Sequence, residues 1–277
     1  MGPLLGVRSA RIQPAAVAAL VALTMAVPAA AQIDYRNLDD DRPTLIEDAY
    51  PVERLAFEFL APWRFSRNGT GNVHAFVPEI EYGVFPNFQF GLKLSVAGAA
   101  SADADREWGL SGLRLFGLYN FNTESAWLPA LSLRTDLSLP VGSLAGEGTR
   151  ATVKGIATRS WGRSRVHLNG AYTIGRDGDR AVAEVASKWW AGAAVDRTLF
   201  RRSTLVVAEI YARREETAAP LETNASLGFR YQWSPYTVVD AGVTRRLRAA
   251  GPDLEITIGI SRAFAIAGLF PAGRAGK

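Results

Sequence analysis

Most of the chain repeats one pattern, in which apolar and polar residues alternate. In the segment 88–96 every second residue is apolar, and the residues between them are polar or small. The segments 131–139, 166–174 and 254–261 alternate in the same way. Successive side chains of a β-strand point to opposite faces, whereas a helix brings together residues three or four apart. The pattern therefore predicts strands with one apolar and one polar face.

About twelve such strands are expected, at 54–66, 73–85, 88–99, 110–121, 128–141, 150–161, 164–175, 188–199, 204–215, 223–234, 236–248 and 254–265. Most have the ~9–11 residues that a tilted strand needs to cross a bilayer. Strands of soluble proteins are typically nearer ~5–6 residues. We therefore expect an all-β fold, a transmembrane antiparallel up-and-down β-barrel formed by residues 53–265.

The connections between these strands alternate in length. Those after even-numbered strands are short: Pro86-Asn87, Gly162-Arg163, 201–203 and Ser234-Pro235. Those after odd-numbered strands are mostly longer and more polar: 100–109, 142–149, 176–187 and 217–222. The connections 68–72 and 122–126 do not differ in length. Short periplasmic turns and longer external loops are typical of outer-membrane barrels, and an even strand number leaves both termini in the periplasm.

Aromatic residues lie at the predicted strand ends. Beside the periplasmic turns these are Phe85, Phe88, Phe121, Trp127, Trp161, Phe200, Trp233 and Tyr236. Near the external ends they are Trp63, Phe65, Trp108, Trp189 and Trp190. Two aromatic girdles indicate a barrel anchored at both boundaries between water and lipid, whereas a soluble core would place its aromatics in mid-strand.

The N-terminus has the features of an export signal. Arg8 and Arg11 precede an uncharged stretch with its apolar centre at 15–27, and 29–31 are three alanines. We predict a signal peptide at 1–31, cleaved before Gln32. A membrane anchor is the alternative, but the apolar centre is shorter than the ~20 residues of a spanning helix. The mature protein is then expected in the outer membrane of a Gram-negative bacterium.

Two further segments flank the predicted barrel. The polar, Asp-rich stretch 32–52 is expected to be an irregular periplasmic lead-in, and 266–277 a C-terminal tail. The net charge of +4 is too small and too scattered to indicate a nucleic-acid partner. Because the chain has no Cys and only two His, we expect neither disulfides nor a metal site. No phosphate loop or glycine fingerprint is present in the sequence, so no cofactor is expected. The expected partners are outer-membrane lipid and small-molecule solutes, and the oligomeric state stays open.

If the apolar faces meet lipid, the alternate faces line the lumen. Glu58, Glu79, Glu81 and Glu255 then form an acidic wall, and strands 88–99 to 150–161 a basic one. The alternative is that these charges simply pair with each other in a polar interior. Twelve strands predict a narrow passage, because eight are filled by side chains and sixteen leave a water channel. The residues predicted to line the pore are Glu58, Glu79, Glu81, Lys93, Arg134, Asp136, Lys154, His167, Asp196, Glu209, Arg230, Asp240 and Glu255.

A catalytic role has little support in the sequence. The run His167-Leu168-Asn169-Gly170 partly matches the His-x-Ser-Asn-Gly motif of outer-membrane phospholipases, but the Ser is absent. His167 also points inward by parity, away from a lipid substrate. No catalytic residue is therefore predicted, and a lipid-modifying barrel enzyme is the least favoured alternative.

Short motifs resemble one bacterial barrel family. They include Arg42-Pro43-Thr44 and Glu47-Asp48-Ala49-Tyr50 before the first strand, and Asp240-Ala241-Gly242-Val243 and Pro252-Asp253-Leu254 near the end. The chain resembles a family of outer-membrane β-barrels that is described as the MetA-pathway of phenol degradation family or as transporter-like. The resemblance implies an outer-membrane barrel that passes hydrophobic or aromatic compounds. It supplies no catalytic residue.

The sequence as a whole predicts an outer-membrane β-barrel that acts as a narrow, porin-like channel or transporter for small solutes. The main alternative is a non-conducting structural barrel, closed by paired charges and by the segment 32–52.

Overall fold

The computed structural model describes residues 32–68, 71–101, 104–175, 188–199, 203–214, 220–248 and 252–266. The predicted signal peptide and the tail from 267 onward lie outside the described residues. The strands are β1 (Phe57–Leu60), β2 (Trp63–Asn68), β3 (Gly71–Phe76), β4 (Glu79–Phe85), β5 (Phe88–Ser101), β6 (Ala104–Asn122), β7 (Ala130–Leu139), β8 (Arg150–Trp161), β9 (Ser164–Ile174), β10 (Trp189–Thr198), β11 (Thr204–Arg214), β12 (Glu222–Ser234), β13 (Thr237–Arg248) and β14 (Leu254–Phe264).

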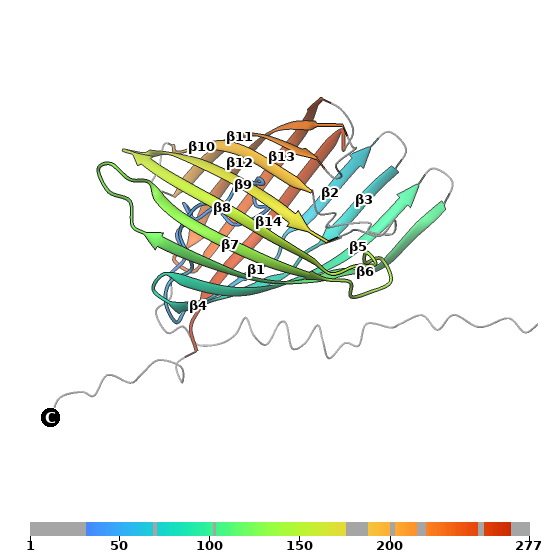
Figure 1. The fold of residues 1–277 in the computed structure, drawn as a ribbon, viewed down its shortest axis with the longest axis horizontal. Helices are drawn as coiled ribbons and strands as arrows, with labels where there is room; N and C mark the ends of the chain where they lie inside the picture. The colour runs from blue at the N-terminus through green and yellow to red at the C-terminus, as the bar shows by residue number, and fades with distance from the viewer. Residues whose placement is uncertain are drawn as a thin grey trace, which may run out of the picture.

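These strands form a closed antiparallel barrel in which twelve strands cross, as predicted (Figure 1). β1 and β2 make one crossing interrupted at Pro62, and β3 and β4 make another interrupted at Pro78. Proline lacks the N–H that a β-ladder needs, so each ladder breaks there. The breaks are short, because Val77 N still donates to Pro62 O at 3.0 Å. β14 closes the ring by pairing with both β1 and β2.

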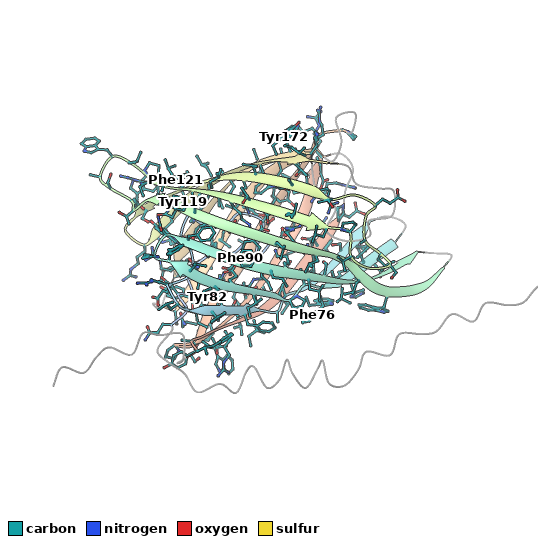
Figure 2. The ribbon with its side chains drawn as sticks, turned by 60° about the horizontal axis from the view of Figure 1, so that its bottom comes forward. Phe76, Tyr82, Phe90, Tyr119, Phe121 and Tyr172 are labelled. Carbon is teal, nitrogen blue, oxygen red and sulfur yellow. The ribbon has the colours of Figure 1, made fainter. Side chains whose placement is uncertain are left out.

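The two surfaces of the barrel are inverted relative to those of a soluble protein. Apolar side chains lie on the outside, where Ile258 is 52% and Leu227 is 54% exposed. Charged side chains such as Arg134 and Arg230 lie fully buried inside. Figure 2 shows the same outward placement for the aromatic side chains that it labels, including Phe90 and Tyr119. An apolar exterior around a charged interior is the arrangement of a barrel surrounded by lipid.

Aromatic side chains surround the barrel at its periplasmic end, as predicted. Phe85, Phe121, Trp127, Trp161 and Trp233 are all more than half exposed.

At the external end Trp108 is also exposed, but Trp190 departs from the predicted girdle. Its ring packs inside the barrel against the cluster that contains Leu38 and Ile46. Because Trp189 and Trp190 are consecutive in β10, only one of them can face outward. The assignment of Trp190 to the girdle was therefore wrong.

The connection predicted at 100–109 is largely strand. β5 continues to Ser101 and β6 starts at Ala104, with Gly98 opposite Trp108. Beyond the bilayer both faces of a strand meet water, so the apolar alternation that marks a strand is lost although the backbone pairing continues.

No helix among the described residues is long and apolar enough to span a membrane.

The segment expected as a periplasmic lead-in lies inside the barrel instead. Residues Ile33–Val52, here called the plug, run within the ring of strands and are drawn in blue in Figure 1. Ile46 and Ala49 are completely buried, Ile46 against β10 and β11 and Ala49 against β6, β7 and β8. The expectation was wrong because a polar segment need not be exposed to solvent. It can be buried when the rest of the protein offers a polar surface that it can bind.

Candidate functional site

The plug is a loop closed at its neck and turned sharply at its tip. At the neck, Asp48 N donates to Leu38 O at 3.0 Å, and Leu38 N donates to Asp48 Oδ2 at 3.1 Å. At the tip, Arg42 N donates to Asp39 O at 3.1 Å, and Asp41 has a φ of 67°. A turn this tight directs consecutive side chains to different sides. Asp40 and Arg42 therefore reach different parts of the barrel wall.

One side of the tip faces four cations from neighbouring strands, here called the basic cluster. Asp40 carboxylate oxygens lie 2.5 Å from Lys154 Nζ, 3.3 Å from Lys93 Nζ, 3.3 Å from Arg114 and 3.6 Å from Arg134. Burial alone would raise the pKa of Asp40, but the charges of this cluster, led by Lys154, hold that pKa well below its usual range. The cluster consists of Lys93 (β5), Arg114 (β6), Arg134 (β7) and Lys154 (β8).

Glu47 of the plug binds the same cluster. Its carboxylate lies 2.8 Å from Arg134 and 2.5 Å from Lys154. Arg134 is further held by Asp136 at 3.1 Å and by the ring of Phe116, which its guanidinium covers at 3.7 Å. Phe116 and Leu118 are buried, so the inner face of β6 carries apolar as well as polar side chains.

The other side of the tip forms ion pairs of both polarities. Arg42 donates to Asp240 at 3.2 Å and to Ser261 Oγ at 2.6 Å. Arg230 of β12 reaches Asp39 at 2.7 Å. The plug thus offers carboxylates to the basic cluster and an arginine to Asp240, so that its charges complement those of the wall.

The wall also binds the plug backbone. Glu209 accepts hydrogen bonds from Leu45 N at 3.0 Å and Ile46 N at 2.9 Å. Asn169 accepts from Glu47 N at 3.0 Å and donates to Glu47 O at 2.9 Å. An irregular segment has no ladder to satisfy its own backbone, and these side chains supply the missing partners.

Glycines of β12 and β13 let the plug approach the wall. A Cβ on Gly242 would lie 1.9 Å from Pro43 O, and one on Gly228 would lie 2.8 Å from Pro43 Cγ. Any side chain at Gly242 would therefore overlap with the plug backbone.

His167 lies in a chain of buried polar groups near the plug neck. It contacts Thr158 Oγ1 at 3.0 Å through Nδ1 and Asp196 at 3.0 Å through Nε2. This resembles the order of a hydroxyl, imidazole and carboxylate in hydrolases. However, Thr158 is completely buried and accepts a hydrogen bond from Ala49 N at 3.0 Å, and Arg165 binds Asp196 at 2.6 Å. The arrangement leaves no space for a substrate beside the hydroxyl.

Of the thirteen residues predicted to line the pore, twelve are buried in the barrel interior, and Glu255 is half-buried. Glu58 lies opposite Glu81 on β1 and β4. Glu79 pairs with Lys93 at 3.3 Å, so the predicted acidic and basic walls meet directly. That these side chains border a solute pathway stays a prediction.

Sequence reasoning missed the plug, the wall residue Arg165, and the uncharged side chains of the wall that bind the plug. Parity would have found the uncharged ones, because they alternate with lipid-facing residues. The plug itself has no period to detect. The missed residues are Asp39, Asp40, Arg42, Glu47, Asp48, Gln89, Asn120, Thr158, Arg165, Asn169 and Gln232.

The fold is shared with known channels, whereas the sequence is not. No protein-family model matches the chain, and no curated protein shows significant sequence similarity to it. A COG4313 outer membrane channel from Pseudomonas putida F1 aligns with a TM-score of 0.62 at 13% identity, over 82% of this chain and 100% of its own. A KdgM porin solved in complex with disordered oligogalacturonate aligns with a TM-score of 0.50 at 15% identity, over 76% of this chain and 99% of its own.

The closed barrel with a lipid-facing exterior therefore defines a β-barrel protein of the Gram-negative outer membrane.

Proposed function

We propose that the protein is a channel for small solutes whose resting state is closed by the plug. The observation that carries the proposal is the pairing of the plug carboxylates Asp40 and Glu47 with the basic cluster of the wall. Residues 32–52 contain six Asp and Glu but only two Arg, whereas residues 53–277 contain 27 Lys and Arg against 21 Asp and Glu. The acidic plug therefore offsets an excess of positive charge in the rest of the mature chain.

The nature of the contacts supports a plug that can leave. It is joined to the wall by ion pairs, side-chain hydrogen bonds, apolar contacts and one backbone hydrogen bond, from Ile33 N to Pro235 O, whereas the strands are joined to their neighbours by backbone ladders. Contacts to water can replace the hydrogen bonds of the plug at moderate cost, because a protein hydrogen bond contributes only about 0.5–1.5 kcal/mol net.

The similar structures support the same class of function. One is described as an outer membrane channel and another as a porin in complex with disordered oligogalacturonate. The resemblance to the MetA-pathway of phenol degradation family suggests aromatic solutes. The charged interior of this chain favours polar or anionic solutes instead.

Conductance in planar bilayers tests the proposal. We expect the full mature chain to conduct rarely and a variant lacking Ile33–Val52 to conduct steadily. A barrel that still shifts on SDS gels when boiled controls for folding of the deletion variant. A folded deletion variant without conductance would overturn the channel function.

The same interior favours one alternative, a closed structural barrel. Arg134 and Lys154 are completely or almost completely buried and each contacts two plug carboxylates. Such a network can have a purely structural role, in which it does no more than fill the barrel. The structural barrel predicts no conductance in either variant, whereas the plugged channel predicts it after deletion.

A further inference from the structure

The basic cluster holds two plug carboxylates at the same point. Asp40 Oδ1 and Glu47 Oε2 each lie 2.5 Å from Lys154 Nζ, so these two oxygens are separated by no more than twice that distance. Arg134 contacts both carboxylates as well. The plug therefore presents two carboxylates at a spacing that a short dicarboxylic acid can reproduce.

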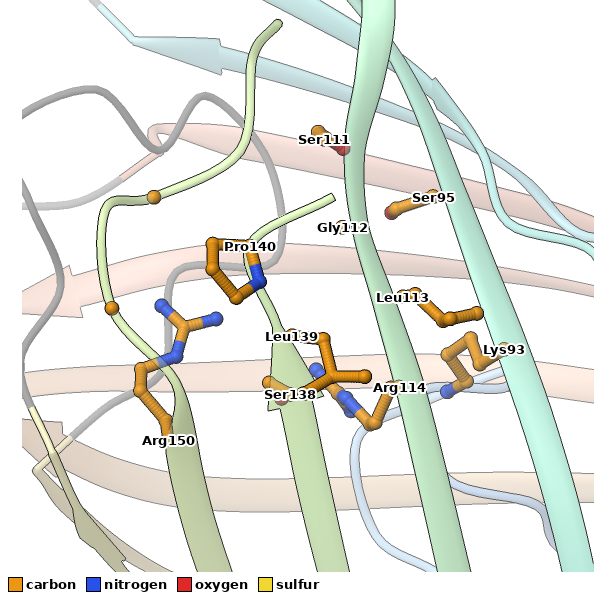
Figure 3. A pocket seen from close by; sticks show the side chains of 12 residues that line it. Lys93, Ser95, Ser111, Gly112, Leu113, Arg114, Ser138, Leu139, Pro140 and Arg150 are labelled. Carbon is orange, nitrogen blue, oxygen red and sulfur yellow. The ribbon is translucent and has the colours of Figure 1, made fainter. Parts of the chain in front are cut away.

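A cavity borders this cluster (Figure 3). It lies under the connection between β7 and β8, and Lys93 and Arg114 border it while also contacting Asp40. The enclosed part has room only for water-sized groups. A larger ligand can therefore bind only by taking the place of a plug carboxylate. The polar residues lining the cavity are Lys93, Ser95, Ser111, Arg114, Ser138 and Arg150.

Two buried hydroxyls in this cavity lack a partner. Ser95 Oγ and Ser111 Oγ make no hydrogen bond within the described part of the chain, although both residues are at least nine-tenths buried. Ser111 is the extra residue of a β-bulge, because Ser95 pairs with Gly112 and Val96 with Leu110. A bulge redirects a side chain, and this one places a hydroxyl in the cavity. Unsatisfied buried donors beside cations are suited to an anionic ligand.

We propose that the cavity and the basic cluster together form a binding site for small organic dicarboxylates, which enter from the external side and displace Asp40 and Glu47. The inference rests on the proposed channel function, because displacement of these two side chains removes the contacts of the plug with the basic cluster. The ligand thereby opens the path that it uses.

A single cysteine in the plug tests the displacement in the full mature chain. Ala49 is completely buried and the natural chain has no Cys, so an Ala49→Cys variant carries one reporter thiol. Its rate of reaction with a methanethiosulfonate reagent measures plug release. We expect succinate to raise this rate about tenfold or more, and acetate and the uncharged succinamide to have little effect. Sodium chloride at equal ionic strength controls for screening.

Two added serine substitutions distinguish the contribution of the cavity from that of the contacts that hold the plug. The hydroxyls of Ser95 and Ser111 make no hydrogen bond to the plug, so in a Ser95→Ala, Ser111→Ala variant the basal labelling rate should stay unchanged while the succinate response weakens several-fold. Ser66→Ala is the matched control, because Ser66 bonds Glu255 at 3.0 Å outside the cavity, and its response should equal that of the reporter alone.

The outcomes separate this inference from the channel function. Equal acceleration by succinate, acetate and chloride would overturn the dicarboxylate site and show screening alone. Acceleration that survives loss of both serines would overturn the role of the cavity. If deletion of the plug opens the channel but succinate does not speed labelling, the inference fails and the channel stands. If succinate speeds labelling but the deletion variant never conducts, the channel fails and the binding site stands.

Discussion

At the scale of single residues, the interior is organised by pairs whose members come from different segments. Arg42 and Asp240 illustrate this, since one belongs to the plug and the other to β13. Removing one member of a buried ion pair leaves an unpaired charge and typically costs about 3–5 kcal/mol. The plug and wall thus depend on each other, and substitutions in the wall are expected to act through the plug.

Gly242 provides a direct test of that dependence. Gly242→Val places a side chain where Pro43 O now lies, and overpacking typically costs about 1–3 kcal/mol. We expect the plug to dissociate more often while the barrel stays folded, so that thiol labelling of the Ala49→Cys reporter accelerates about tenfold. Gly170→Val is the control, because a Cβ there meets nothing within 4 Å. Equal labelling rates in the two variants would contradict the packing of Pro43 on β13.

The outer face gives a second prediction at this scale. Ile258 lies near the middle of β14 and is 52% exposed, whereas Leu247 is exposed near the external end of β13. Ile258→Arg should lower the free energy of unfolding by about 2–4 kcal/mol, because a charge at the bilayer midplane is that costly. Leu247→Arg should cost about 0–1 kcal/mol. Urea titration of barrels folded in lipid measures both, and equal losses would show that Ile258 does not lie at the midplane.

Which residues the sequence could identify follows from periodicity. Lys93, Arg134 and Glu209 alternate with apolar neighbours, so parity alone places them inside. Arg165 obeys the same parity but was missed, because it stands close to a turn where the alternation begins. Asp40 could not be found this way, since its position depends on four cations that are 53 to 114 residues distant.

At the scale of elements, the strands and the plug differ in what holds them. Each strand has backbone partners on both sides, and two crossings tolerate a proline because their neighbours continue the ladder. The strand number and most strand ends were predictable for this reason. The plug has no backbone ladder with the wall, so no local rule of the sequence indicates whether it docks.

A reversible crosslink tests the plug as an element. Ala49 and Ala130 belong to one buried apolar cluster, and the absence of other cysteines makes an Ala49→Cys, Ala130→Cys pair specific. Oxidation should abolish the occasional openings of the full chain, and a reducing agent should restore them in single-channel recordings. Each single-cysteine variant is a control, and its openings should change with neither treatment. Openings that persist after complete crosslinking would mean that ions pass beside a docked plug.

At the scale of the whole molecule, the barrel interior has a basic side and an acidic side, and the plug contacts both. The basic cluster occupies the neighbouring strands β5 to β8, and the Glu58–Glu81 pair lies on β1 and β4. With the plug docked, Asp40 and Glu47 neutralise much of the basic side. With the plug removed, that side loses its counter-charges while the acidic side loses Arg42, so that the open barrel should prefer anions.

Ion selectivity of the plug-deleted barrel therefore reports the exposed basic cluster. Charged walls select ions of opposite sign, since they offset part of the hydration that an ion loses. In a salt gradient, Lys93→Gln with Lys154→Gln should shift the reversal potential toward cation preference. Glu79→Gln with Glu81→Gln should shift it further toward anions. Both shifts should shrink near 1 M salt, where charges are screened within ~3 Å. Unchanged reversal potentials in both double variants would mean that the ions take a path away from these side chains, and the interior charges would then serve only to hold the plug.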